Sequence, residues 1–259
     1  MPPRLPILAA LAFLAAAPAA QAEGIDPTHD YGPGYAPVTS TWFRRADPAA
    51  RDADRRYIQG MRPHHAGALS MAEDYLRDPD ARSPVLRRLA GAIIANQRYE
   101  IALLDEVARQ IEAPPSVLAL GPVRLALQPI ATEDLGQAWQ FQRVPIPGPG
   151  DVAAGPPPNA TDVRFAKAMS IHHQAALDMV RSYSADPAAN NGFLGWLNVG
   201  IATDQSQEIA LMRAAVRRFP GDPDAVRVDP SMIHGMEGMQ HEGQGAPGAP
   251  PPDAHQHHR

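Results

Sequence analysis

The sequence contains no cysteine among its 259 residues, so it can form neither a disulfide nor a thiolate metal site. A chain of this length can stabilise itself by burying a hydrophobic core, and 44% of its residues are hydrophobic. Any soft metal ligand in this protein must therefore be the thioether of methionine.

Positive charge is also scarce, and Lys167 is the only lysine. Without Arg4, which lies in a segment that we expect to be removed, 22 basic and 28 acidic side chains leave a net charge of −6. An acidic chain with no basic cluster is poorly suited to nucleic acids or anionic membranes. The partner that we expect is a metal ion.

The sequence lacks any run of about 18 apolar residues, the length that a membrane-spanning helix needs. Residues 1–22 instead combine Arg4, a short apolar run over 5–17 and a small-x-small site at 20–22. This pattern is typical of a secretory signal peptide, and an uncleaved anchor is the alternative. We expect the protein to be exported, most simply to the periplasm, with no membrane insertion after cleavage.

The remaining chain divides by composition into five segments. We expect an extended arm (23–46), a helical hairpin (47–113), a proline-rich connector (114–160) that could hold a strand or a short helix, a second hairpin (161–220) and a disordered tail (221–259). Apolar residues at helical spacing predict helices over 47–76, 84–112, 162–183 and 193–219.

Histidine and methionine gather in one short stretch that occurs twice. "MRPHHAGALSM" at 61–71 and "MSIHHQAALDM" at 169–179 are offset by 108 residues. The shared histidines and methionines are Met61, His64, His65 and Met71 in the first copy and Met169, His172, His173 and Met179 in the second.

The repeat extends well beyond this motif at the same offset. "EIAL" occurs at 100–103 and again at 208–211, and Asp54 and Tyr75 match Asp162 and Tyr183. An unbroken offset across helix, turn and helix indicates two copies of one αα-hairpin. Because a lone hairpin cannot bury its apolar stripe, we predict an all-α fold in which the two copies form a ferritin-like four-helix bundle.

Helical geometry places the motif side chains of each copy on one face, since successive residues turn by about 100°. If each hairpin turns near its centre, its second helix brings polar residues opposite this face. Gln97 then lies across from His64, and Glu100 lies across from Met61. Gln205 and Glu208 are the counterparts in the second copy, and these four residues could orient a ligating imidazole or bind metal themselves.

This constellation has two interpretations, a metal site and a metal-free polar layer in the core. Thioether and imidazole without thiolate suit Cu(I), and imidazole also accepts Cu(II), so copper is the expected metal. Zinc rarely takes methionine. A ferritin-type di-iron oxidase needs several inward carboxylates and Glu-x-x-His pairs, whereas each repeat shares only one Glu and no Glu-x-x-His.

Methionine and histidine also recur in the tail, in "MIHGMEGMQH" and "HQHH". The candidate ligands there are Met232, His234, Met236, Met239, His241, His255, His257 and His258. We expect this segment to bind copper independently of the bundle and more weakly, because ordering a flexible chain costs free energy.

The repeated M-x-x-H-H-x-x-A-L-x-M, followed by a helix with Q-x-x-E-I, resembles the family called domain of unknown function 305, over about 47–112 and 160–220. The resemblance implies an exported, ferritin-like helical bundle, and some members of that family bind copper or confer copper resistance through His and Met. One departure is Met212, which follows the second "EIAL" where the first copy has Leu104. If Met212 is a ligand, the two halves are not equivalent.

The expected function is copper sequestration or transport, for tolerance or homeostasis, by a protein that is not an enzyme. No Ser-His-Asp set, phosphate loop or carboxylate dyad appears in the sequence. The alternatives are a ferritin-like metal-dependent oxidoreductase and a metal-free structural or interaction bundle.

Overall fold

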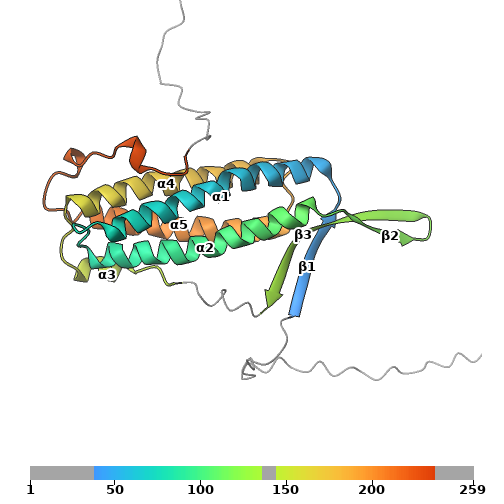
Figure 1. The fold of residues 1–259 in the computed structure, drawn as a ribbon, viewed down its shortest axis with the longest axis horizontal. Helices are drawn as coiled ribbons and strands as arrows, with labels where there is room; N and C mark the ends of the chain where they lie inside the picture. The colour runs from blue at the N-terminus through green and yellow to red at the C-terminus, as the bar shows by residue number, and fades with distance from the viewer. Residues whose placement is uncertain (1–37, 136–143, 237–259) are drawn as a thin grey trace, which may run out of the picture. The chain divides into compact units, whose positions relative to one another are not determined.

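Two helical hairpins make up most of the chain that the computed structural model describes, which is residues 38–135 and 144–236 (Figure 1). The first hairpin consists of α1 (Pro48–Arg77) and α2 (Pro84–Glu112). The second consists of α4 (Ala160–Ala185) and α5 (Gly192–Val216). The four helices that the repeat predicts are therefore present, with ends within three residues of the expected positions.

Each of these four helices begins at a polar side chain that caps its first turn. Asp47 accepts from the amide of Ala49, and Ser83 accepts from the amide of Leu86. Asn159 forms a reciprocal capping box with Asp162, and Asn191 caps α5. These side chains satisfy amides that have no partner inside the helix, so the sequence sets the helix starts locally.

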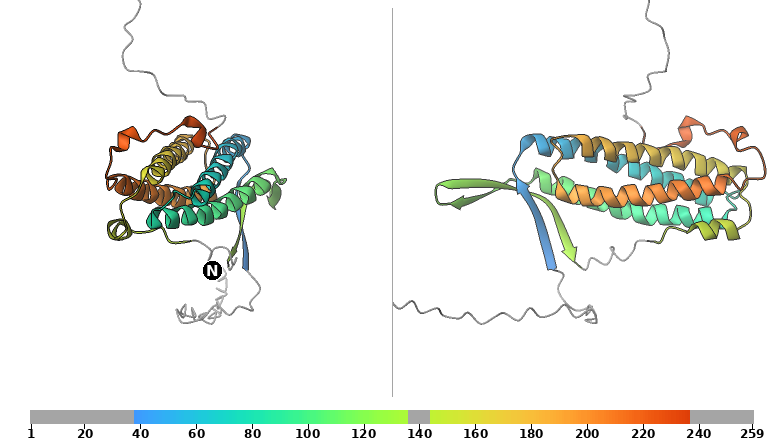
Figure 2. Two further views of the ribbon diagram at one scale, coloured as in Figure 1. Left: turned by 60° about the vertical axis from the view of Figure 1, so that its left-hand side comes forward. Right: turned by 180° about the vertical axis from the view of Figure 1, so that it is seen from behind.

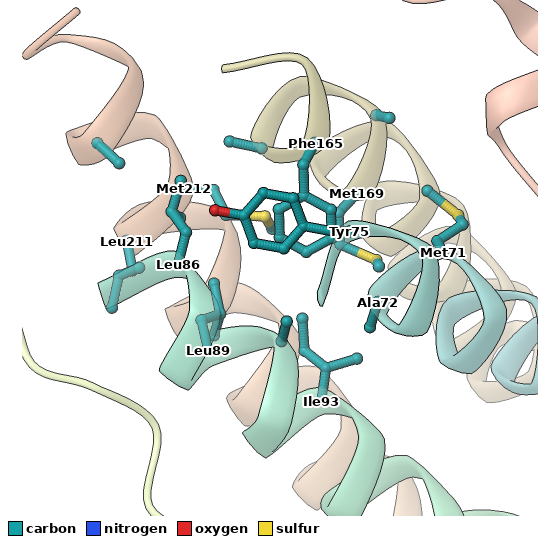
Figure 3. Packing of buried hydrophobic residues seen from close by; sticks show 14 of the residues in the cluster. Met71, Ala72, Tyr75, Leu86, Leu89, Ile93, Phe165, Met169, Leu211 and Met212 are labelled. Atoms are coloured by element: carbon teal, nitrogen blue, oxygen red, sulfur yellow. The ribbon is translucent and has the colours of Figure 1, made fainter. Parts of the chain in front are cut away.

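The two hairpins pack on each other through α1 against α4 and through α2 against α5. The left-hand view of Figure 2 looks obliquely along the four helices, which surround a shared interior. Two hydrophobic clusters fill this interior, one around Tyr75 and Leu89 and the other around Tyr57 and Leu104. In the first cluster the rings of Tyr75 and Phe165 stack at 4.0 Å (Figure 3).

A three-stranded antiparallel sheet accompanies the helices, so the prediction of an all-α fold is wrong in this respect. The strands are β1 (Val38–Arg45), β2 (Ser116–Leu120) and β3 (Val123–Leu135), in the order β1-β3-β2. β1 lies in the expected extended arm, and β2 and β3 lie in the expected connector. β2 and β3 join through a tight turn in which Gly121 has a φ of +61°, a conformation that favours glycine.

The inner part of the sheet is fixed to the helices. Gln128 on β3 donates to the carbonyls of Gln110 and Ala113 at the end of α2. Arg44 on β1 lies 2.8 Å from the buried carboxylate of Asp54 on α1. The connector and the arm thus stabilise one end of the bundle, and the connector also contains the short helix α3 (Pro149–Ala154).

The first part of the tail is ordered, which corrects the prediction of disorder for residues 221–236. Two short 3₁₀ helices, η2 (Pro223–Ala225) and η3 (Pro230–Met232), lie in this segment, which we call the C-terminal strap. Lys167 anchors the strap by donating to the carbonyls of Pro223 and Val226. Within the described residues, no helix is long and apolar enough to cross a membrane.

Candidate functional site

Reciprocal hydrogen bonds relate the two halves of the bundle by an approximate twofold symmetry. The hydroxyl of Tyr75 donates to Asp162 over 2.6 Å, and that of Tyr183 donates to Asp54 over 2.7 Å. An offset of 108 residues converts one pair into the other. The contact between the hairpins is therefore self-complementary, as in a symmetric dimer.

The symmetry brings the two double-histidine motifs together in the core. α1 and α4 pack with Tyr57 beside Tyr183 on one side of the motif and Tyr75 beside Phe165 on the other. Between these pairs the rings of His64 and His172 stack, with their centroids 3.6 Å apart. The two copies of the motif therefore contribute to one site.

Eight polar residues form a layer at this level, between the two hydrophobic clusters. All are at most 3% exposed. We call this set the histidine layer, and it consists of His64, His65, Gln97, Glu100, His172, His173, Gln205 and Glu208. Buried polar groups of this kind cost free energy unless they have partners, so their hydrogen bonds decide what the layer can do.

Three of the four imidazoles use the Nε2 atom for a hydrogen bond. His65 Nε2 lies 2.9 Å from Glu100, and the symmetric His173 Nε2 lies 2.6 Å from Glu208. His64 Nε2 lies 3.0 Å from the carbonyl oxygen of His172. Because a carbonyl oxygen can only accept, His64 carries its proton on Nε2, and its Nδ1 atom has a free lone pair.

Nine other side-chain atoms of the layer are buried and have no hydrogen-bond partner. They are the Nδ1 atoms of His64, His65, His172 and His173, the Nε2 atom of His172, and both amide atoms of Gln97 and Gln205. An unsatisfied buried polar atom costs about 1–3 kcal/mol. Nine such atoms in one layer form an unusual concentration, and a ligand would satisfy several of them.

Burial keeps the central imidazoles neutral. Removal from water is the main cause that lowers the pKa of His64 to about 3, and the nearby His65 and His173 lower it further. Burial also lowers the pKa of His172 well below its usual value, with smaller effects from the other three histidines. A neutral imidazole is the form that binds a metal ion.

The polar residues of the second helices reach the layer in a register that differs from the expected one. The simple hairpin alignment places Glu100 opposite Met61, but Glu100 hydrogen-bonds His65, four residues further along α1. Gln97 and Gln205 are buried in the layer as the repeat predicts, yet their amides bond to neither histidine expected opposite them.

The methionines of the two motifs occupy different environments. Met61 belongs to the cluster around Tyr57, and Met169 belongs to the cluster around Tyr75. Each precedes a double histidine by three and four residues and so adjoins the layer on its own helix. These two thioethers flank the layer, one on each side.

Met71, Met179 and Met212 have different surroundings from these two. In Figure 3, Met71 and Met212 appear on opposite sides of the stacked Tyr75 and Phe165 rings. Met212 receives a weak hydrogen bond from Ser170, and the sulfur of Met179 packs against Gly60 of α1. That Met71, Met179 and Met212 are metal ligands stays a prediction.

Among the tail residues, Met232, His234 and Met236 lie in the C-terminal strap. His234 contacts α1 through Ser70, a residue that sequence reasoning did not select. Met239, His241, His255, His257 and His258 lie outside the described residues.

In the described conformation, no three His, Asp or Glu side chains of residues 38–135 and 144–236 converge as a metal-binding group. A metal in the layer would therefore take a mixed set of imidazole and thioether ligands, or would draw the imidazoles together. The unpartnered Nδ1 atoms are the donors that such a set would use.

Comparison with protein families decides where this chain belongs. The family described as Domain of unknown function (DUF305) matches residues 39–117 and 162–255, which is more than half of the chain. The chain belongs to the DUF305 family. The match is split between the two halves, in agreement with the tandem repeat. No curated protein and no solved structure matches this DUF305 protein.

Proposed function

We propose that this DUF305 protein is exported, binds copper in its histidine layer and thereby sequesters or carries the metal outside the cytoplasm. The observation that carries the proposal is the set of four buried imidazoles whose Nδ1 atoms have no partner. Each repeat contributes two of these imidazoles, so both repeats build the layer equally.

The hydrogen bonds of the layer resemble the support that metal-binding histidines usually have. A ligating imidazole commonly donates its other N–H to a carboxylate or a carbonyl, which orients the ring. His65 and His173 have Glu100 and Glu208 in this role, and His64 has the carbonyl of His172. In each of these three rings the Nδ1 atom then carries a lone pair that is available to a metal ion.

The available donors favour copper over other metals. The described core offers imidazole nitrogens and the thioethers of Met61 and Met169, but no thiolate, because the chain has no cysteine. Imidazole and thioether suit Cu(I), and imidazole also accepts Cu(II). The carboxylates of the layer, Glu100 and Glu208, already accept from histidines, which argues against a carboxylate-rich di-iron oxidase.

A metal-free structural layer is the second candidate, and the three hydrogen bonds of the imidazoles favour it. They satisfy part of the layer without any ligand. Under this reading, the layer specifies the pairing of the two hairpins. A metal-free layer leaves the four Nδ1 atoms and both glutamine amides without hydrogen-bond partners, and we prefer the metal site for this reason.

The test is an anaerobic Cu(I) titration of the full chain against a competing chromophoric chelator. Replacing His64, His65, His172 and His173 together by Gln should remove the tightly bound copper. The double variant Glu100→Gln/Glu208→Gln is the graded control, because it keeps all four Nδ1 donors. It should weaken binding by roughly 10- to 100-fold without abolishing it.

The outcomes separate the two candidates. Tight copper uptake by the wild type and its loss in the quadruple variant support the metal site. If the wild type takes up no copper while the quadruple variant unfolds far more easily, the structural layer is correct instead.

A further inference from the structure

The C-terminal strap crosses α1 of the first repeat directly beside the double histidine. Ser70 and the Nδ1 atom of His234 lie 2.6 Å apart. Figure 1 shows the strap, drawn in red, running back along α4 towards α1. The strap is therefore held at both ends, by Lys167 and by Ser70.

Two glycines permit a backbone contact between the strap and the helix. A Cβ atom on Gly67 would lie 2.4 Å from the carbonyl oxygen of His234, which is closer than real Cβ atoms come. Gly235 has a φ of +71°, and a Cβ atom there would lie 2.7 Å from the carbonyl oxygen of Pro63. The crossing point therefore requires glycine on both sides.

The two repeats differ at the residues that receive the strap. Pro63, Gly67 and Ser70 of the first copy correspond to Ile171, Ala175 and Asp178 of the second. Ala175 has the Cβ atom that Gly67 lacks, and Ile171 is 48% exposed. The strap is thus specific to the first copy, and the surface of the second copy stays open at Ile171.

A pocket of about 240 Å³ lies where the strap meets α1 and α4. Met71, Met232 and His234 line it together, along with Asp74, Asp78 and Arg164. The contact with Ser70 occupies Nδ1 of His234, so Nε2 is the nitrogen available to a ligand. Two thioethers and one imidazole form a soft donor set. The carboxylates of Asp74 and Asp78 are balanced by Arg164 in the pocket and by Arg77, which pairs with Asp74.

We infer that Met71, Met232 and His234 form a second binding site for a soft monovalent cation, Cu(I) or Ag(I), at the surface of the first repeat. The site rests on the proposed copper function and adds an entry point one to two helical turns from His64 and His65 along α1. The strap is then a part of the site, rather than a tail that binds metal independently of the bundle.

The test compares Met71→Leu with the control Ile171→Leu in the full chain. Ile171 is the repeat counterpart of Pro63, is 48% exposed on α4 and belongs to neither candidate metal site. Anaerobic titration with Cu(I), and separately with Ag(I), should show one site lost or weakened at least roughly tenfold in Met71→Leu. Ile171→Leu should titrate as the wild type does.

Two further variants separate ligand loss from damage to the fold. His234→Gln changes only the strap and should weaken the same site. Gly67→Ala keeps all three donors but displaces the strap, and should also weaken it, although alanine ordinarily favours a helix.

The result that overturns the inference is a His234→Gln or Met71→Leu protein that binds both ions as Ile171→Leu does. The inference and the proposed function can fail separately. Loss of all copper in the quadruple histidine variant, with no effect of the strap variants, refutes the strap site alone. Absence of copper binding by the wild type refutes both.

Discussion

Acid should destabilise the metal-free bundle through the two stacked histidines, and the size of the effect can be worked out from their burial. In the folded protein the pKa of His64 is about 3 and that of His172 is also well below its usual value. In the unfolded chain both pKa values return to about 6.5. The unfolded state therefore binds protons first, so stability is complete above about pH 6.5 and falls as the pH drops towards 3.

Between pH 7 and pH 5 the neutral, buried His64 should lower the free energy of unfolding by about 2 kcal/mol, and His172 should lower it further in the same direction. That is a large part of the 5–15 kcal/mol typical of a domain. Urea unfolding at several pH values, with copper removed, measures this slope. His64→Leu/His172→Leu should flatten it, and equal slopes in the variant and the wild type would refute the burial argument.

Four further substitutions test the fold. Tyr75→Phe and Tyr183→Phe should each cost about 1 kcal/mol in urea unfolding, since each removes one hydrogen bond to a buried aspartate, and unequal effects would contradict the symmetry. Arg44→Met should cost about 3–5 kcal/mol in the same assay, because it leaves the buried carboxylate of Asp54 without its cation. Gly121→Ala should lower the midpoint of thermal unfolding by straining the β2–β3 turn, and an unchanged midpoint would count against the turn as described.

The repeat made most of the helical structure predictable from sequence. Helix α2 occupies the expected residues 84–112, and α1 ends one residue beyond its expected limit. Both helices begin at local signals, a polar cap followed by proline. The same offset correctly predicted that two hairpins are present.

The sheet was harder to predict because its strands are distant in sequence. β1 pairs with β3 across the entire first hairpin, with Thr41 opposite Thr132. The β-branched and aromatic residues of β1 favour a strand, but nothing local indicates the partner. Glycine and proline in the surrounding segments concealed the pattern further.

The residues of the histidine layer were predicted from the sequence, but the hydrogen bonds between them were not. Which turn of α2 faces His65 depends on how the hairpin closes, so the bond to Glu100 required the structure. The strap was missed for a similar reason, since it docks by backbone contact at Gly67. The difference between Gly67 and Ala175 in otherwise matching repeats was the signal that could have indicated it.

The most direct measurement of the central claim is the nitrogen NMR spectrum of the imidazoles, recorded on ¹⁵N-histidine-labelled full chain before and after anaerobic addition of Cu(I). Coordination in the histidine layer should shift the Nδ1 resonances of His64, His65, His172 and His173. The Nε2 atoms of His65 and His173 should keep their protons, because Glu100 and Glu208 hold them. Unchanged Nδ1 resonances in these four residues, with shifts confined to the histidines after residue 230, would contradict the account.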